Sequence, residues 1–488
     1  MVKSSYSHSS SSAPHSSSSS SKIQYPPGPH SILPNKLLLE FIKNPIKTLM
    51  EIAYTYGDIA HFKFGRQHVY LLNNPQYIED VLVRNYKNFI KSKGLQVSKR
   101  LLGEGLVTSE GEYHESQRRI IQPAFHPNLI SKYGDIMTSY TVNMCQRWED
   151  GTILDIHKEM INLTSAIISK ALLGSNVKSQ QADEVGDALL TCAEYFNRLL
   201  MPFGELIEKI PILPINKGFH RAKDKLDSIV YAMIKEHREN EIKNAVTSDL
   251  LFTLLQAQDT DLGIGRMTDS QLRDEVMTIF LAGHETTANA LTWTFYLLSQ
   301  YPNVETRLYE ELCDVLGNDD VDKSDGNVER RIPTIEDIPK LEYTEKIFRE
   351  SMRMYPPAWT IGRQAVHNYK IGKYVIPAGS IILMSQYVMH HSPRFFSDPD
   401  VFYPDRWTRE TKLNLPRFSY FPFGGGIRGC VGEPFAWIEG ILLIATICRQ
   451  WRMHHDASHK VELRPLITLR PKHGMRMRLE RRTNRHGR

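Results

Sequence analysis

The sequence of 488 residues lacks any run of about 18 apolar residues, so no transmembrane helix is predicted. It also has little cysteine. The five cysteines, at positions 145, 192, 313, 430 and 448, are too few and too scattered for a disulfide framework or a zinc site. All except the one at 430 lie in helical patterns and are expected to be ordinary thiols. This cysteine usage suits a reducing compartment, and we expect a cytoplasmic protein.

The N-terminus lacks the apolar core of a secretory signal peptide. Thirteen of the first 21 residues are Ser, and residues 1–24 are predicted to form a disordered polar tail. Net charge is +5, but residues 465–488 carry eight Lys or Arg against Glu480 alone, so the rest of the chain is near −2. That balance argues against nucleic-acid binding by the protein body. We interpret the basic end, and residues 481–488 in particular, as solvated rather than as bound to an anionic surface.

One Gly-rich segment contains the most distinctive chemistry. Residues 421–434 run Phe-Pro-Phe-Gly-Gly-Gly-Ile-Arg-Gly-Cys-Val-Gly-Glu-Pro, and Cys430 is their only redox-capable side chain. Glycines allow a tight loop without side-chain bulk. An apolar helical pattern follows, and Pro434 suits its first turn, so Cys430 precedes a helix N-terminus that favours the thiolate. Such a loop can approach the face of a large flat cofactor, and Arg428 can reach an anionic group on its rim.

Two other interpretations of this segment are weaker. One is a buried structural cysteine in a Gly-rich turn. The other is a dinucleotide loop, because Gly424 to Gly429 also spells G-x-G-x-x-G. That motif requires a preceding strand, and an acidic residue on a second strand about twenty residues later. A long apolar helix, Phe435 to Trp451, is predicted there instead.

The spacing of Phe423, Gly426, Arg428, Cys430 and Gly432 fits the signature Phe-x-x-Gly-x-Arg-x-Cys-x-Gly. The segment therefore resembles the haem-ligand loop of the cytochrome P450 superfamily. The resemblance implies haem b as cofactor, Cys430 as the thiolate ligand of its iron, and a cofactor-contacting loop. Other residues implied to bind the cofactor are His114, Arg118, Arg363 and Arg428 at the propionates, and Phe423, Gly424 and Gly432 in the loop.

A second motif lies in the longest predicted helix. Thr268-Asp-Ser-Gln271 forms a capping box, and the helix should end near Tyr301, where Pro302 follows. Polar residues interrupt its apolar middle, which often marks function. The segment 280–287 resembles the P450 motif that passes over the haem. The resemblance implies that Ala282 and Gly283 lie at the cofactor, that the Thr286 hydroxyl bonds the Ala282 carbonyl, and that Glu285 and Thr286 deliver protons.

A third match is structural. Glu350 and Arg353, three apart on a predicted helix, share one face. Arg406 lies between this helix and Cys430, as in the family's Glu-Arg-Arg trio. A buried charged trio must have every partner satisfied, so we expect it to lock the fold behind the haem loop.

The other predicted elements also follow the family's order. They are a helix from Leu37 to Tyr56, a β-hairpin around Gly65, a helix from Pro75 to Val83, a flexible loop over 94–110, and short strands at 374–376 and 380–384. The apolar, Pro-broken patch near 199–215 matches the family's lid over the substrate channel. It is open whether this patch touches a membrane surface weakly or is ordinary packing. Residues expected to line the substrate cavity are Phe280, Trp359, Leu466 and Ile467.

The sequence therefore predicts one mainly α domain with a small β lobe over residues 25–480. The resemblance implies a monomeric monooxygenase that inserts one oxygen atom from O₂ into a small apolar substrate. We expect no fused reductase, so electrons originating from NAD(P)H should arrive through a separate ferredoxin, flavodoxin or flavoprotein reductase, and Arg118 and Arg119 fit an acidic partner. The alternatives are a peroxide-driven peroxygenase and a haem-based sensor or carrier. The pair Glu285 and Thr286 favours O₂-dependent turnover over both.

Overall fold

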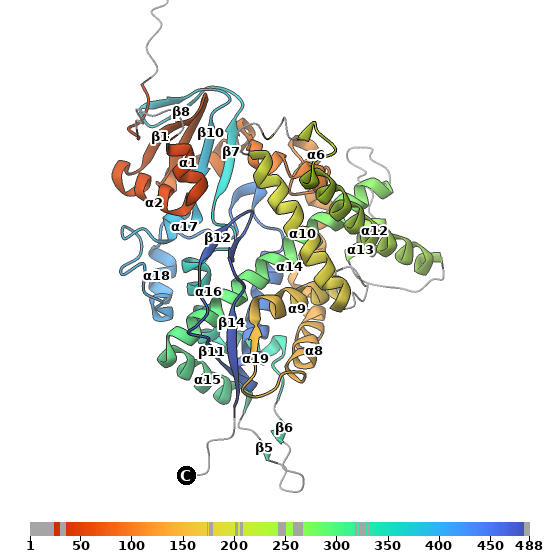
Figure 1. The fold of residues 1–488 in the computed structure, drawn as a ribbon. Helices are drawn as coiled ribbons and strands as arrows, with labels where there is room; N and C mark the ends of the chain where they lie inside the picture. The colour runs from red at the N-terminus through yellow and green to blue at the C-terminus, as the bar shows by residue number, and fades with distance from the viewer. Residues whose placement is uncertain are drawn as a thin grey trace, which may run out of the picture.

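The structure is a computed structural model that describes residues 24–29, 36–172, 174, 179–200, 204, 208–242, 250–256, 267–317, 320–321, 328–329 and 331–482. Except for Gln24, the predicted tail at 1–24 lies outside these residues, as do residues 483–488 and, within the apolar patch near 199–215, residues 201–203 and 205–207. The described part is mainly helical with a small β-rich lobe (Figure 1), as predicted. Within it, no helix is both long and apolar enough to cross a membrane.

The helices form the larger part of the molecule, and α8, α9, α10 and α12 lie on the side away from the β lobe (Figure 1). The main helices are α2 (Pro45–Tyr56), α6 (Gly111–Ile121), α8 (Gly134–Cys145), α9 (Ile156–Ala171), α10 (Ser179–Leu200), α12 (Pro214–Ile242), α13 (Leu250–Gln256), α14 (Asp269–Gln300), α15 (Pro302–Leu316), α16 (Glu342–Met354) and α19 (Glu433–Gln450).

The β lobe is built on a five-stranded sheet of order β1-β2-β10-β7-β3. Its β10 runs parallel to β2, and the other neighbours are antiparallel. Its strands are β1 (Ile59–Phe64), β2 (Gln67–Leu72), β3 (Phe89–Lys91), β7 (Ile361–Ala365) and β10 (Ile381–Met384). A second sheet joins β11 (Trp451–His455), β14 (Arg476–Arg481) and β4 (Ile153–Asp155), so the end of the chain pairs with its first half. Two hairpins are β8 (Tyr369–Ile371) with β9 (Tyr374–Ile376), and β12 (Leu463–Pro465) with β13 (Leu469–Pro471).

The long helix α14 follows the sequence prediction closely. It has 32 residues, begins at Asp269 after the N-cap Thr268, and ends at Gln300 before Tyr301. The capping box of Thr268 and Gln271 is present. Since most of its residues are buried, α14 forms the centre of the main hydrophobic core.

Two local predictions were wrong. The expected helix Leu37–Tyr56 is two helices, α1 (Lys36–Lys43) and α2, because Asn44 caps the second and Pro45 opens it. The expected flexible loop at 94–110 begins with two short helices, α4 (Lys93–Gln96) and α5 (Lys99–Leu102). Its glycines serve close packing instead. A Cβ atom on Gly105 would lie 2.1 Å from the Thr278 hydroxyl of α14.

The basic end is less solvated than predicted. Arg482 is an ion-pair partner of Glu305 and donates to the Cys448 carbonyl at 2.8 Å. Arg470 is largely buried, 3.8 Å from Glu285. The ordered contacts therefore continue beyond residue 480, and part of this positive charge is neutralised inside the protein.

Candidate active site

The Gly-rich segment forms a tight loop that presents Cys430 to a cavity of about 1680 Å³. The Cys430 amide donates to the Phe423 carbonyl at 2.9 Å, and the Gly424 amide to the Phe421 carbonyl at 2.9 Å. Gly426 has φ +70°, and a Cβ atom there would lie 2.0 Å from the Leu82 carbonyl oxygen. Glycine is therefore required at 426 both by conformation and by close approach.

The thiol of Cys430 is subject to opposing influences. Its surface is open to the cavity, but desolvation by the protein around it raises the pKa of Cys430 to about 11, while the Gly432 amide and the Arg118 guanidinium act in the opposite direction. The helix that follows does begin at Glu433, as predicted. Its N-terminus alone does not outweigh burial, so a bound metal cation would have to displace the thiol proton.

A group of cations surrounds one side of the same cavity. It consists of Lys91, Arg118, Arg363 and Arg428, together with His114. Burial, then Arg428 and Lys91, lower the pKa of His114 to about 3, so this imidazole is neutral. Burial and Arg428 lower the pKa of Lys91 to about 6, and burial lowers that of Arg363 to about 10. Near neutral pH the positive charge therefore comes mainly from the three arginines, and charges gathered this closely favour an anionic ligand.

Several of these cations also hold the loops that carry them. Arg118 donates to the Gly429 carbonyl at 2.7 Å, next to Cys430. Arg428 donates to the Ser109 carbonyl at 3.0 Å and pairs with Glu110. Lys91 donates from Nζ to the carbonyls of Leu106 and Ser109 at 3.1 and 2.9 Å. Lys91 was not predicted from the sequence, because an isolated Lys in a short strand matches no motif.

The middle of α14 forms the wall of the cavity with Ala282, Gly283 and Thr286. The Thr286 hydroxyl donates to the Ala282 carbonyl at 2.6 Å, the bond expected from the sequence. Gly283 also has a packing role. A Cβ atom on it would lie 2.5 Å from Cδ1 of Ile168 on α9, so glycine allows α9 and α14 to pack closely.

The Glu285 side chain belongs to a polar network beside the cavity. Its Oε1 accepts from the Thr468 hydroxyl at 2.6 Å and lies 3.8 Å from Arg470. Thr468 in turn accepts from Asn289 at 3.2 Å, and Asn289 bonds His157 at 3.0 Å. Glu285 is not among the lining residues, whereas its neighbour Thr286 is. The sequence had indicated Glu285, but its partners lie far along the chain and follow no local spacing.

Three of the four predicted substrate-cavity residues line the cavity: Trp359, Leu466 and Ile467. Trp359 donates from its indole to the Leu466 carbonyl at 2.9 Å. Phe280 was placed wrongly. It is buried and stacks on His284, with ring centroids 5.3 Å apart, and Ile279 lines the wall instead. A shift of one residue on a helix turns the side chain by about 100°, enough to move it off the wall.

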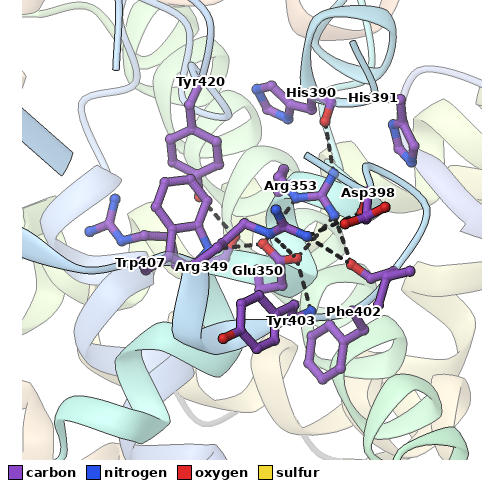
Figure 2. Close-up of polar contacts among 12 residues, drawn as sticks. Arg349, Glu350, Arg353, His390, His391, Asp398, Phe402, Tyr403, Trp407 and Tyr420 are labelled. Carbon is purple, nitrogen blue, oxygen red and sulfur yellow. Dashed lines mark hydrogen bonds and ion pairs between the residues drawn. The ribbon is translucent and has the colours of Figure 1, made fainter. Parts of the chain in front are cut away.

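The trio of Glu350, Arg353 and Arg406 comes together as predicted. Figure 2 shows Glu350 facing Arg353. Glu350 accepts from both arginines, at 2.8 to 2.9 Å. It also accepts from the Trp407 indole at 2.9 Å and the Tyr403 amide at 3.1 Å. Glu350 and Arg353 are fully buried, and every charge in the trio has partners.

His390 connects this trio to the cysteine loop. Arg353 donates to the His390 carbonyl at 2.8 Å, and Nε2 of His390 accepts from the Phe421 amide at 3.0 Å. Burial lowers the pKa of His390 well below its ordinary value, which keeps Nε2 available as an acceptor. The sequence did not single out His390, because its role depends on two segments meeting in space.

The residues around the cavity fit a haem. Cys430 supplies a soft ligand at the cavity surface, and the glycines 424, 429 and 432 leave that surface without bulk. Three arginines and Lys91 line a position suited to carboxylates. Elsewhere in the described residues, no group of three His, Cys, Asp or Glu side chains is placed to hold a metal ion.

Comparison with known proteins agrees with this assignment. A profile of the cytochrome P450 family matches residues 25–476. Cyclooctatin synthase of Streptomyces melanosporofaciens is 33% identical over 90% of this chain and 93% of its own length. Cyclooctat-9-en-7-ol 5-monooxygenase of the same organism is 35% identical over 84% and 85%. Pentalenene oxygenase of Streptomyces avermitilis is 30% identical over 91% and 94%.

The fold has solved counterparts as well. The heme domain of a cytochrome P450DA mutant superimposes with a TM-score of 0.79, covering 94% of this chain and 98% of that chain at 23% identity. A cysteine loop, a polar interruption in the long helix and a buried Glu-Arg-Arg trio occur together here, in a chain matched by the family over most of its length. The chain belongs to the cytochrome P450 family and is a haem-thiolate monooxygenase.

Proposed function

We propose that this P450 inserts one atom of O₂ into an apolar terpene hydrocarbon or terpenoid and uses electrons from a separate redox protein. The observation that carries the proposal is the placement of Thr286 and Cys430 on one cavity whose walls include Ile279, Trp359 and Leu466. The cavity volume, about 1680 Å³, exceeds that of a pocket that binds a typical drug-sized ligand.

Haem would be held by Cys430 and by the basic side chains of Lys91, Arg118, Arg363 and Arg428, and when bound it would supply reductive activation of O₂. The protein's own task is to keep water out and to time protons. The Thr286 hydroxyl lies on the cavity wall and can hold a water or pass a proton. Glu285 can relay a proton from solvent to Thr286 once its carboxylate leaves Thr468, takes up that proton and turns toward the cavity.

The proposed substrate class is inferred from the apolar residues of the cavity wall and from the names of the relatives. The wall offers apolar side chains from α14, from the segment around Trp359, and from the turn at Leu466. Two relatives are named for cyclooctatin chemistry and one for pentalenene. A rigid apolar substrate gains most from burial in such a cavity and offers few hydrogen-bonding groups for a polar site to recognise.

Electrons are proposed to reach the site from a ferredoxin or flavodoxin with its reductase, with NAD(P)H as the indirect source. Arg118 cannot belong to the docking surface that we expected for an acidic partner, because its side chain lines the cavity and donates to the Gly429 carbonyl. Arg119, one residue later, is exposed.

The test is to load the protein with haem and to screen terpene hydrocarbons and alcohols by the change in haem absorbance that accompanies binding. Hits are then incubated with a surrogate ferredoxin, its reductase, NADPH and ¹⁸O₂. We expect an alcohol that carries one labelled oxygen. Product formed from H₂O₂ without reductant would favour the peroxygenase, and binding without any product would favour the sensor.

A further inference from the structure

A buried amide on the cavity wall has no partner in the protein. Gln386 is fully buried and lines the cavity, yet neither its Nε2 nor its Oε1 forms a hydrogen bond with any of the described residues. Leaving a buried polar group unpaired is costly, so native proteins seldom do so. The two atoms, a donor and an acceptor, are therefore available to a ligand in the cavity.

The backbone around Gln386 is held firmly. Gln386 is the first residue of α17 (Gln386–His390), and Ser385 caps that helix. The Ser385 hydroxyl donates to the Trp359 carbonyl at 2.8 Å, and the Tyr387 amide donates to the same carbonyl at 3.2 Å. Because both neighbours of Gln386 are tied to one residue, its backbone has a fixed position beside the segment that carries Trp359.

A second unpaired polar group belongs to that segment. Thr360 follows Trp359 and also lines the cavity, and its hydroxyl is buried without a hydrogen-bond partner among the described residues. The Thr278 hydroxyl on the cavity is unpaired in the same sense, but it lies against Gly105, where a Cβ atom would come within 2.1 Å of it. Gln386 and Thr360, which we call the polar pair, thus come from two neighbouring segments.

The polar pair suits an uncharged hydroxyl group. The amide of Gln386 offers both a donor and an acceptor, and so does the hydroxyl of Thr360. An alcohol can donate to Oε1 and accept from Nε2, whereas a carboxylate would be drawn to the three arginines on the same cavity. The cavity is also lined by the apolar residues Phe348, Met352 and Pro357, which suit a hydrocarbon skeleton.

We propose that Gln386, assisted by Thr360, binds a hydroxyl group of the substrate, so that the enzyme prefers a terpene alcohol to a terpene hydrocarbon. The inference rests on the proposed function and narrows its substrate class. A hydroxyl already present on the substrate must come from an earlier step, either water capture at the end of a cyclisation or a preceding oxygenation. The enzyme then adds a second oxygen function at a position that the bound hydroxyl determines.

Matched pairs of ligands test the polar pair without turnover. The haem-loaded protein is titrated with borneol and bornane, and with cedrol and cedrane, and each Kd is obtained from the change in haem absorbance. A purely apolar cavity binds the hydrocarbon better, because burying an unpaired hydroxyl is costly. We expect each alcohol to bind about tenfold or more tightly than its own hydrocarbon.

Substitutions then assign the preference to particular side chains. Gln386→Met retains the length of the side chain and removes both polar atoms, and should lower the preference for the alcohol about tenfold or more. Thr360→Val should lower it by less. The matched control is Gln67→Met, since Gln67 also lines the cavity but its amide already donates to the Gly379 carbonyl at 2.9 Å. Gln67→Met should retain the preference.

Stability separates a ligand site from a structural role. Removing an unpaired buried amide should not destabilise the ligand-free protein, so Gln386→Met should unfold in urea at the same midpoint or a higher one. Gln67→Met, which breaks existing hydrogen bonds, should unfold at a lower midpoint. Gln386→Leu serves where methionine fits poorly. If both Gln386 variants lose stability, or both release haem to apomyoglobin faster, the amide has a structural role or belongs to the haem pocket, and the inference is overturned.

The ligand pairs also distinguish this inference from the proposed function. An equal ratio of the two Kd values in the unmodified protein, Gln386→Met and Gln67→Met overturns the inference. It leaves the proposed reaction intact, because terpenes still bind and can still be oxidised. If none of the four compounds changes the haem absorbance, the proposed terpene substrate class is wrong, and the preference for an alcohol is overturned with it.

Discussion

At the scale of single residues, Cys430 is the first to test. If its sulfur binds haem iron, the reduced protein with carbon monoxide should show the long-wavelength Soret band typical of thiolate ligation. Cys430→Ser and Cys430→His should both lose this band. The control is Cys313→Ser, which changes a cysteine on α15 that does not line the cavity. A band that survives in Cys430→Ser would mean that another residue binds the iron.

Substitution of Thr286 should lower the yield of product per NADPH, whereas substitution of Glu285 should lower the turnover rate. Thr286→Ala should still bind haem and substrate and consume NADPH, but much of that consumption should end as peroxide. Loss of a positioned proton donor typically costs about 10²–10⁴-fold, so a large fall in product per NADPH is expected. Glu285→Gln should slow turnover instead. Thr468→Val removes the hydroxyl that holds Glu285 and should change rate rather than coupling. Equal rate and coupling in all four proteins would remove the proton-delivery role.

Lys91 should make the stability of the haem-free protein depend on pH. Burial and Arg428 lower the pKa of Lys91 in the folded protein to about 6, against an ordinary value of 10.5 for a solvated lysine. Between these values the unfolded chain binds more protons, so stability rises with pH across that window. Each pH unit corresponds to at most about 1.4 kcal/mol. Urea unfolding at pH 7 and pH 9 should show this rise in the unmodified protein and a smaller one in Lys91→Met. An identical rise in both would show that Lys91 is not its source.

At the scale of elements, His390 is the connection between the buried trio and the cysteine loop. His390→Phe leaves the Phe421 amide without its acceptor in a buried setting, which costs about 1–3 kcal/mol. We expect faster haem loss, measured by transfer to apomyoglobin. His391→Phe is the matched control, because His391 bonds the Tyr387 carbonyl and not the loop. Equal haem loss in the two variants would contradict the link.

Helix bounds were predicted correctly where neighbouring residues determine them, and less well where contacts with distant segments do. The bounds of α14 were predicted within one residue, because Thr268, Gln271 and Pro302 act on their own neighbourhood. The break between α1 and α2 was missed although Asn44 and Pro45 signal it, since the apolar pattern on both sides is continuous. The sequence does not predict the short helices α4 and α5, because glycines at 94, 103 and 105 are typical of a flexible loop. Gly105 is held instead by contact with α14.

The same distinction applies to the site. Cys430, Thr286 and Glu350 belong to motifs with fixed spacing and were predicted. Lys91, His390 and the partners of Glu285 were not, because they reach the site from distant segments. Phe280 was misplaced because periodicity alone does not fix which way a buried helix is turned.

At the scale of the whole molecule, the buried trio should control global stability. Glu350→Gln retains the size of the side chain but leaves Arg353 and Arg406 without their carboxylate. Removing one partner of a buried ion pair typically costs about 3–5 kcal/mol. Denaturant unfolding of the haem-loaded protein should therefore shift strongly, or the variant should fail to accumulate. Glu345→Gln is the control, since Glu345 lies on the same helix in a half-exposed pair with Arg349. Equal stability of the two variants would show that the trio is dispensable.

The contact between Glu285 and Thr468 has a consequence for how the protein is made. During translation, Glu285 emerges from the ribosome 183 residues ahead of Thr468. The cysteine loop is itself completed only shortly before that point, and β14 must then return to pair with β4. A nascent chain thus carries an unfinished pocket for most of its synthesis, and haem has a complete site to enter only near the end. A premature stop just after the cysteine loop would spare Cys430 and still remove Thr468 and Arg470, which contact the Glu285 carboxylate.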